Sequence, residues 1–254
     1  MRLRKSVVCV IPVLLVALVR PLHAQQFTSD NYLAMPHGTV SSLLTAGTEY
    51  SALMISVAAF RNWEFFAGAF LTWDDGDSVI GFSTTTYAKY MFTENATKNG
   101  GVAVAFGQGS HPGFSVRDSL GSSYKQLFAI PQFSVPLLSG RLLWDLNPGV
   151  LVNFDYGEEG DTAWGFSYAT RLALYGVVPK SALVGEIYGT EGDINDAIQY
   201  RIGLRWEPSS SFIAAVSWSQ AFNGSPSGGF EVGIMLFSPR FACIGGCDPD
   251  EYSD

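Results

Sequence analysis

Apolar and polar positions alternate along much of this chain. In residues 197–207, AIQYRIGLRWE, one set of alternate positions is apolar, whereas the other is polar or charged. The same period of two runs through residues 141–156, RLLWDLNPGVLVNFDY, and shorter copies occupy 64–73, 165–174 and 229–237. Because successive side chains of a strand point to opposite faces, the pattern predicts β-strands with one apolar and one polar face.

This alternation, together with the turn residues between its segments, predicts twelve strands. We place them at residues 41–50, 53–60, 63–73, 80–93, 101–108, 124–136, 141–156, 164–175, 181–190, 197–207, 212–222 and 229–237. An even number of antiparallel strands brings both termini to the same end of the sheet.

Alternation alone fits both a large β-sandwich and a transmembrane barrel, so other features must separate them. Hydrophobic residues make up 47% of the chain and charged residues only 15%. After residue 24, however, no apolar run reaches the length of a spanning helix. Helices and closed barrels are the only structures that satisfy every backbone group in a bilayer. Aromatic residues stand near the strand ends, as in the interfacial girdles of barrels: Trp73, Trp144, Tyr156, Trp164, Trp206, Trp218 and Phe222. We therefore predict an all-β fold, a transmembrane antiparallel β-barrel of about 12 strands.

The connections between the strands predict an orientation. Those near residues 61, 137, 176 and 208 are compact, whereas those at the other end are longer and acidic. Bacterial barrels have short periplasmic turns and longer outer loops. We assign to the outer side the loops that contain Asp74, Asp75 and Asp77, then Glu158, Glu159 and Asp161, and then Glu191, Asp193 and Asp196. Each acidic triad by itself fits a solvated loop, and we predict no metal site.

The two ends of the chain lie outside the predicted barrel. Residues 1–24 combine Arg2, Arg4 and Lys5, an apolar stretch and a small residue, Ala24, as in a cleaved signal peptide. We divide the rest into a lead-in segment (25–38), the barrel (39–238) and an acidic tail (239–254). In an exported protein, Cys243 and Cys247 are expected to form a disulfide. Export of such a barrel implies the outer membrane of a Gram-negative bacterium.

Four short stretches resemble a known family. YLAMPHGTV follows the signal, RNWEFFAGAF comes early, and LVGEIYG is followed by YRIGLRWEP late in the chain. In these stretches the chain is similar to outer-membrane transporters grouped with the meta-pathway phenol-degradation barrels. The resemblance implies a passive channel or transporter for small, hydrophobic or aromatic solutes. The chain departs from common barrels in continuing beyond the last strand at Phe237.

The polar faces of the predicted strands carry charges that should line the lumen. They are Glu49, Glu64, Lys89, Arg141, Asp145, Asp155, Arg171, Glu186, Arg201, Arg205, Glu207 and Glu231. Two interpretations stay open: the charges select solutes along a polar pathway, or they pair and fill a narrow, plugged barrel. Glu186 should lie near Arg201 and Arg205, because it is one strand before them.

Other functions have weaker support in the sequence. The acidic balance (23 Asp and Glu against 15 Lys and Arg) disfavours nucleic acid as a partner. Ser110, His111 and Ser115 in the longest loop suggest a lipid hydrolase at the rim, but no catalytic motif supports it, so we expect no enzyme. A role in adhesion remains an alternative. We expect no cofactor, and as partners membrane lipid, a small solute and the barrel-assembly machinery; the sequence does not indicate an oligomeric state.

Overall fold

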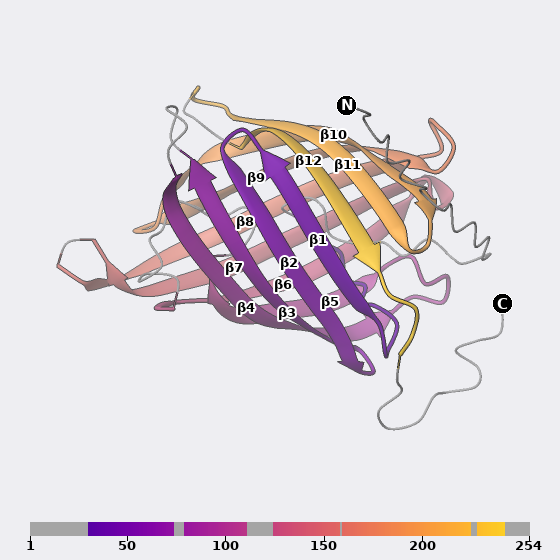
Figure 1. Cartoon of the computed structure of the whole chain (residues 1–254), viewed down its shortest axis with the longest axis horizontal. Coiled ribbons are helices and arrows are strands. Elements are labelled where there is room, and N and C mark those ends of the chain that lie inside the picture. The colour runs from indigo at the N-terminus through magenta and orange to yellow at the C-terminus, as the bar shows by residue number, and fades with distance from the viewer. Residues whose placement is uncertain (1–29, 74–78, 111–123, 158, 225–227, 242–254) are drawn as a thin grey trace, which may run out of the picture.

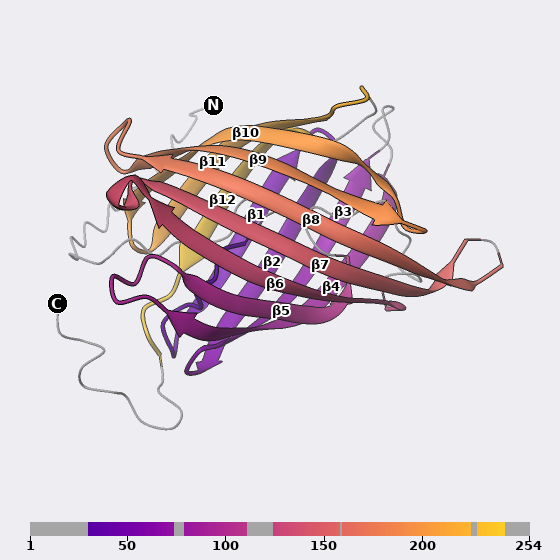
Figure 2. The same cartoon turned by 180° about the vertical axis from the view of Figure 1, so that it is seen from behind.

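The chain folds into a closed antiparallel barrel of twelve strands, as the sequence predicts (Figures 1 and 2). The computed structural model describes residues 30–73, 79–110, 124–157, 159–224 and 228–241. The strands are β1 (Val40–Gly47), β2 (Tyr50–Phe60), β3 (Trp63–Trp73), β4 (Val79–Glu94), β5 (Gly101–Gly109), β6 (Gln126–Leu137), β7 (Leu142–Tyr156), β8 (Asp161–Tyr175), β9 (Ser181–Gly192), β10 (Asp196–Ser209), β11 (Phe212–Ala221) and β12 (Gly229–Phe237). Each strand pairs with its neighbours in the chain, and β1 closes the ring on β12.

One predicted boundary is wrong. The first turn falls at residues 48–49, so β1 ends at Gly47 and β2 begins at Tyr50, whereas the sequence placed the break after residue 50. β1 and β2 form a tight hairpin in which Ala46 opposes Ser51. The alternation continues almost unbroken from one strand into the next here, so the period gave no sign of the turn.

The predicted faces of the strands are confirmed by the burial of their side chains. On β10, Ile198, Ile202, Leu204 and Trp206 are exposed on the outer surface, whereas Arg201 and Arg205 are buried inside the barrel. The outer surface is apolar around the whole ring, as on β12, where Phe230, Val232, Ile234 and Leu236 point outward. Such a surface suits contact with lipid, whereas the polar atoms of the backbone are satisfied between strands.

Aromatic side chains gather on the outer surface near the strand ends. Trp63 packs against Tyr90 with ring centroids 4.8 Å apart, and Tyr90 packs edge-on against Phe92. Further rings of the predicted girdle are exposed: Trp144, Tyr156, Trp164, Trp206, Trp218 and Phe222. The side chain of Trp73 lies outside those described.

The two ends of the barrel differ in their connections. At the end where β1 begins and β12 finishes, here the terminal end, the links are residues 61–62, 95–100, 138–141, 176–180 and 210–211. At the opposite, far end the links at 110–125 and 222–228 are long, but the link at 48–49 has only two residues and that at 193–195 only three. The β7–β8 hairpin projects furthest on the far side (Figures 1 and 2). Three acidic residues that the sequence assigned to outer loops lie in the ends of strands: Asp161 in β8, Glu191 in β9 and Asp196 in β10.

Several predictions concern residues outside the described part of the chain. They are the signal peptide, the Cys243–Cys247 disulfide, and the loop residues Asp74, Asp75, Asp77, His111, Ser115 and Glu158. Within the described ranges, no helix is long and apolar enough to cross a membrane. The one helical element described is a short 3₁₀ turn, Leu138–Gly140, between β6 and β7.

Candidate functional site

A row of alternating charges crosses the inner wall of the barrel. Asp145 on β7 opposes Arg171 on β8, Arg171 opposes Glu186 on β9, and Glu186 opposes Arg201 on β10. Glu231 on β12 ends the row through its contact with Arg201. We call these five residues the charge row. They project inward because each occupies the buried register of its strand, and none is more than 4% exposed.

The strongest link in the charge row joins Asp145 and Arg171. The guanidinium donates from Nε and Nη2 to Asp145 Oδ2, at 2.9 and 2.7 Å. The Ser134 hydroxyl on β6 donates to the other carboxylate oxygen, Oδ1. Both charges of this pair are therefore matched and hydrogen-bonded, as buried charges must be if they are not to destabilise the fold.

At the other end of the charge row, Arg201 is shared between two carboxylates. Its Nη2 donates to Glu231 Oε1 at 2.8 Å, and its Nη1 lies 3.8 Å from Glu186 Oε2. The guanidinium also sits 5.3 Å from the ring centre of Tyr188, and Tyr50 on β2 donates to Glu231. The predicted proximity of Glu186 and Arg201 is thus seen directly.

The remaining predicted lumen charges lie elsewhere. Arg205 Nε and Glu207 Oε1 are 3.0 Å apart near the terminal end, in an ion pair that lacks hydrogen-bond alignment. Asp155 is part-exposed at the far end, where it pairs with Lys125. Two assignments were wrong: Glu49 lies in the β1–β2 turn, and Arg141 is exposed beyond the start of β7. Both residues lie just outside the observed strands, because β1 ends at Gly47 and β7 begins at Leu142.

The segment before β1 enters the barrel, which the sequence reasoning missed. Asp30, Asn31 and Tyr32 are each about 2% exposed. The Asn147 side chain on β7 donates to the Asp30 carbonyl at 2.9 Å, and the Tyr32 amide donates to Ser134 on β6 at 3.1 Å. The segment thus contacts β6 and β7, on the wall opposite β1, before the chain returns to β1. The alternation of apolar and polar positions could not reveal this segment, because it has no regular secondary structure.

Lys89 on β4 ties this segment to the wall. Its Nζ lies 2.9 Å from Asp30 Oδ2 and 3.5 Å from Glu64 Oε2 on β3. Glu64 also accepts hydrogen bonds from the Met35 amide and the Ser56 hydroxyl. One cation therefore lies between a wall carboxylate and a segment carboxylate, and all three groups are buried.

Tyr32 adds a second anchor for the segment. Its hydroxyl donates to Glu94 Oε1 at 3.2 Å, close to the terminal end of β4. Burial, and next the Glu94 carboxylate, raise the pKa of the Tyr32 phenol above its usual range. The phenol therefore keeps its proton and remains a donor over the ordinary range of pH.

The inner wall opposite the charge row carries an aromatic cluster in addition to the Glu64–Lys89 pair. In a ring of twelve strands, β3 and β4 lie across from β9 and β10. The rings of Phe66 and Tyr87 stack with centroids 4.2 Å apart, and Tyr87 meets Phe128 edge-on at 5.8 Å. Phe70, Ile130 and Leu151 extend this buried cluster. The lumen therefore has the charge row on one side, and on the other an aromatic cluster beside the Lys89 site, where the Lys89 ammonium lies 5.6 Å from the ring centre of Phe66.

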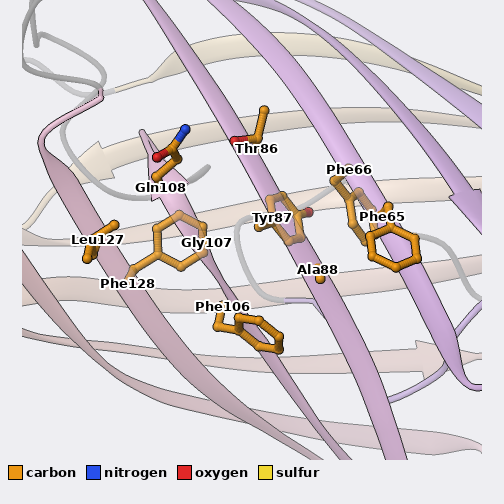
Figure 3. A pocket seen from close by; sticks show the side chains of 10 residues that line it. All are labelled: Phe65, Phe66, Thr86, Tyr87, Ala88, Phe106, Gly107, Gln108, Leu127 and Phe128. Carbon is orange, nitrogen blue, oxygen red and sulfur yellow. The ribbon is translucent and has the colours of Figure 1, made fainter.

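A glycine on β5 lets the rings of β4 and β6 approach each other. Gly107 stands between Tyr87 and Phe128 in the cross-strand register. A Cβ at this position would lie 2.3 Å from both the Thr86 carbonyl oxygen and Tyr87 Cβ. The wall here is hollowed by about 590 Å³ on strands β3 to β6, and Figure 3 shows the side chains that line the hollow. They include buried Phe66, Tyr87 and Phe128 and exposed Phe65, Phe106 and Leu127.

The described residues give little basis for catalysis or metal binding. They contain no group of three or more His, Cys, Asp or Glu side chains placed to hold a metal ion. Ser110 is buried after β5, where its amide donates to the Thr84 carbonyl. Its predicted partners, His111 and Ser115, lie outside the described ranges. What the lumen offers chemically is paired charge, in the charge row and at Lys89, and an aromatic surface opposite the charge row.

Comparison with solved structures identifies proteins of similar fold. No family model matches the chain, and no curated protein matches it in sequence. Among solved structures, the KdgM porin superposes with a TM-score of 0.54 at 12% identity, covering 78% of this chain and 98% of the porin. An outer membrane channel from Pseudomonas putida F1 (TM-score 0.48, 13% identity, 81% and 97% covered) and the NanC porin (0.49, 10%, 78% and 97%) are also similar. The chain thus shares the architecture of an outer-membrane porin barrel.

Proposed function

We propose that this protein is a channel of the outer membrane that passes small solutes. One observation carries the proposal: a closed twelve-stranded barrel with an apolar outer wall encloses a lumen lined by charged and polar side chains. A soluble barrel would expose polar residues to water and bury the apolar ones. The porin-type architecture supports the same conclusion.

The division of the lumen suggests a class of solute. The aromatic cluster, with Phe66, Tyr87 and Phe128, offers faces on which a flat apolar group can stack. The charge row across from it offers paired charges that can exchange hydrogen bonds with a polar group. We therefore expect small solutes with an aromatic or apolar body and one polar end. The family resemblance of the sequence implies a similar class.

The segment before β1 narrows the path of such a solute. It spans the lumen from Asn147 and Ser134 to Glu64 near the terminal end. A solute must pass beside it or displace it. Residues 30–35 are held by hydrogen bonds with wall side chains, and backbone bonds to β2 begin only at Gly38. Displacement of residues 30–35 would therefore leave the barrel wall intact.

Planar-bilayer conductance of the refolded protein tests the proposal. Discrete single-channel steps are expected from the wild type. Asp30→Ala with Tyr32→Ala removes the anchors to Lys89 and Glu94 and should raise the conductance. Glu186→Gln should change the ratio of cation to anion permeability because it removes one negative charge from the lumen. Glu159→Gln, an equal change at an exposed far-end position, is its matched control.

Two results would contradict the proposal. The first is silence of both the wild type and the Asp30 and Tyr32 variant, with folding verified by the shift of gel mobility on heating. The second is an unchanged permeability ratio in Glu186→Gln together with a lower unfolding midpoint. That combination would contradict the part of the proposal that concerns the charge row: it would make the row a structural clamp and not a selectivity element.

A further inference from the structure

Charges of opposite sign are separated between the two ends of the barrel. At the terminal end, the described links and the exit from β12 carry Arg61, Lys98, Arg141, Lys180 and Arg240. We call these five residues the basic rim. The first four are exposed, and Arg240 is partly exposed. The described carboxylates near this end interact with other groups: Glu64 pairs with Lys89, Glu94 accepts from Tyr32, and Glu207 pairs with Arg205.

The far end has the reverse character. Glu159, Asp161, Glu191 and Asp193 are exposed there, and the described cation at this end, Lys125, pairs with Asp155. The separation is not a result of composition, because the chain as a whole carries an excess of acid. In an acidic chain, a rim that carries four of the exposed cations of the described residues presents a local site for anions.

An exposed apolar side chain lies in, or within three residues of, each segment that carries a cation of the basic rim. Phe60 precedes Arg61, Leu138 lies three residues before Arg141, and Phe241 follows Arg240. Exposed Phe92 lies near the end of β4, six residues before Lys98. The exposed Val177 and Val178 are in the same link as Lys180. Side chains of this kind lie in the bilayer while the neighbouring cation reaches to the headgroups.

The aromatic girdle fixes the depth of the rim in the membrane. Trp63, Tyr90 and Phe92 pack together on the outer surface within a few residues of Arg61 and Lys98. Rings of such a girdle sit at the level of the headgroups. The basic rim therefore lies where the phosphate groups of the surrounding leaflet are, with apolar anchors just below it.

We propose that the basic rim binds anionic phospholipids of the leaflet at the terminal end. Arginine and lysine are suited to the phosphate, and attraction to an anionic surface adds for each cation near it. A soluble acidic protein would match the charge but not the apolar side chains between the cations. By the predicted orientation this leaflet is the periplasmic one. The proposed binding concerns the leaflet at the terminal end, whichever side of the membrane that end faces.

Quenching by brominated lipids in vesicles tests the proposal. The probe is the protein with Trp63 as its single tryptophan, the others replaced by Phe, in phosphatidylcholine vesicles with brominated phosphatidylglycerol or brominated phosphatidylcholine. A preference of roughly fivefold for phosphatidylglycerol is expected near Trp63. A second protein that keeps only Trp164, exposed at the acidic far end, should show none.

The decisive variant is Arg61→Gln with Lys98→Gln, Arg141→Gln and Lys180→Gln. It should lose the preference at Trp63, whereas Arg61→Lys with Arg141→Lys should keep it, because charge is conserved. Native mass spectrometry of lipid bound to the same variants with all tryptophans present checks the result independently of the tryptophan replacements. Equal quenching by both lipids at Trp63, the same preference at Trp164, or a preference that survives in the Gln variant would overturn the proposal.

Discussion

Removal of Arg171 should destabilise the barrel more than removal of its partner Asp145. The pair is almost fully buried, with two hydrogen bonds to one carboxylate oxygen. At 2.7 Å and an effective dielectric constant of about 20, their attraction is about 6 kcal/mol before the cost of desolvation. Loss of one partner from a buried pair typically costs about 3–5 kcal/mol. We expect Arg171→Met to fall in that range.

The asymmetry follows from the neighbours of each residue. Without Arg171, the carboxylates of Asp145 and Glu186 both lose a facing cation, and Glu186 keeps only its longer contact with Arg201. Without Asp145, Arg171 still faces Glu186. Asp145→Leu should therefore cost less, and the double variant should lie near the wild type, because removal of both charges leaves the net charge of the row unchanged.

Urea unfolding of the four proteins in lipid vesicles gives the coupling free energy of the cycle. We expect strong coupling: the double variant should be more stable than Arg171→Met alone. Additive effects, or a single-variant cost below about 1 kcal/mol, would show that lumen water solvates these charges as well as they solvate each other.

Three further predictions test the wall and the orientation. Gly107→Ala should lower stability by about 1–3 kcal/mol because its Cβ has no room, whereas Gly185→Ala, with no heavy atom within 4 Å of the added Cβ, should change it little; urea titration compares them. Leu204→Arg places a charge on the lipid face, at a cost of roughly 2–4 kcal/mol near midplane, whereas Gly203→Ser faces the lumen and should be tolerated; equal loss of heat-modifiable mobility would refute the register. In intact cells, a cysteine at Asp193 should react with an impermeant maleimide and one at Ser210 should not.

The wall of the barrel was largely readable from the sequence. Alternation predicted all twelve strands and the inward face of Arg171, Glu186 and Arg201, because a period of two leaves each residue of a strand with only two possible directions. The neighbouring positions of Glu186 and Arg201 followed from the order of the strands. The errors at Glu49 and Arg141 arose at strand ends. At the second of these, Leu138 and Ser139 adopt positive φ and form a short 3₁₀ turn.

What the sequence did not reveal depends on contacts between distant residues. The hydrogen bonds from Asn147 to Asp30 and from Tyr32 to Ser134 join positions 117 and 102 residues apart. No local pattern marks such pairs, because the segment has no period of its own. The close approach at Gly107 is equally hidden: a glycine in a strand reads as a weak strand former, and only the packing of Tyr87 and Phe128 shows why it is needed.

The charge row and the Lys89 site differ in how far their ion pairs depend on the segment before β1. Arg171 holds two wall residues, Asp145 and Glu186, and all three are fixed by strand pairing. Lys89 lies between Glu64 on the wall and Asp30 on a segment that no strand fixes. If the segment withdraws, Lys89 keeps a carboxylate 3.5 Å away and is not left as an isolated buried charge. We therefore expect withdrawal of the segment to leave the pairs of the charge row in place, since none of its five residues depends on Asp30.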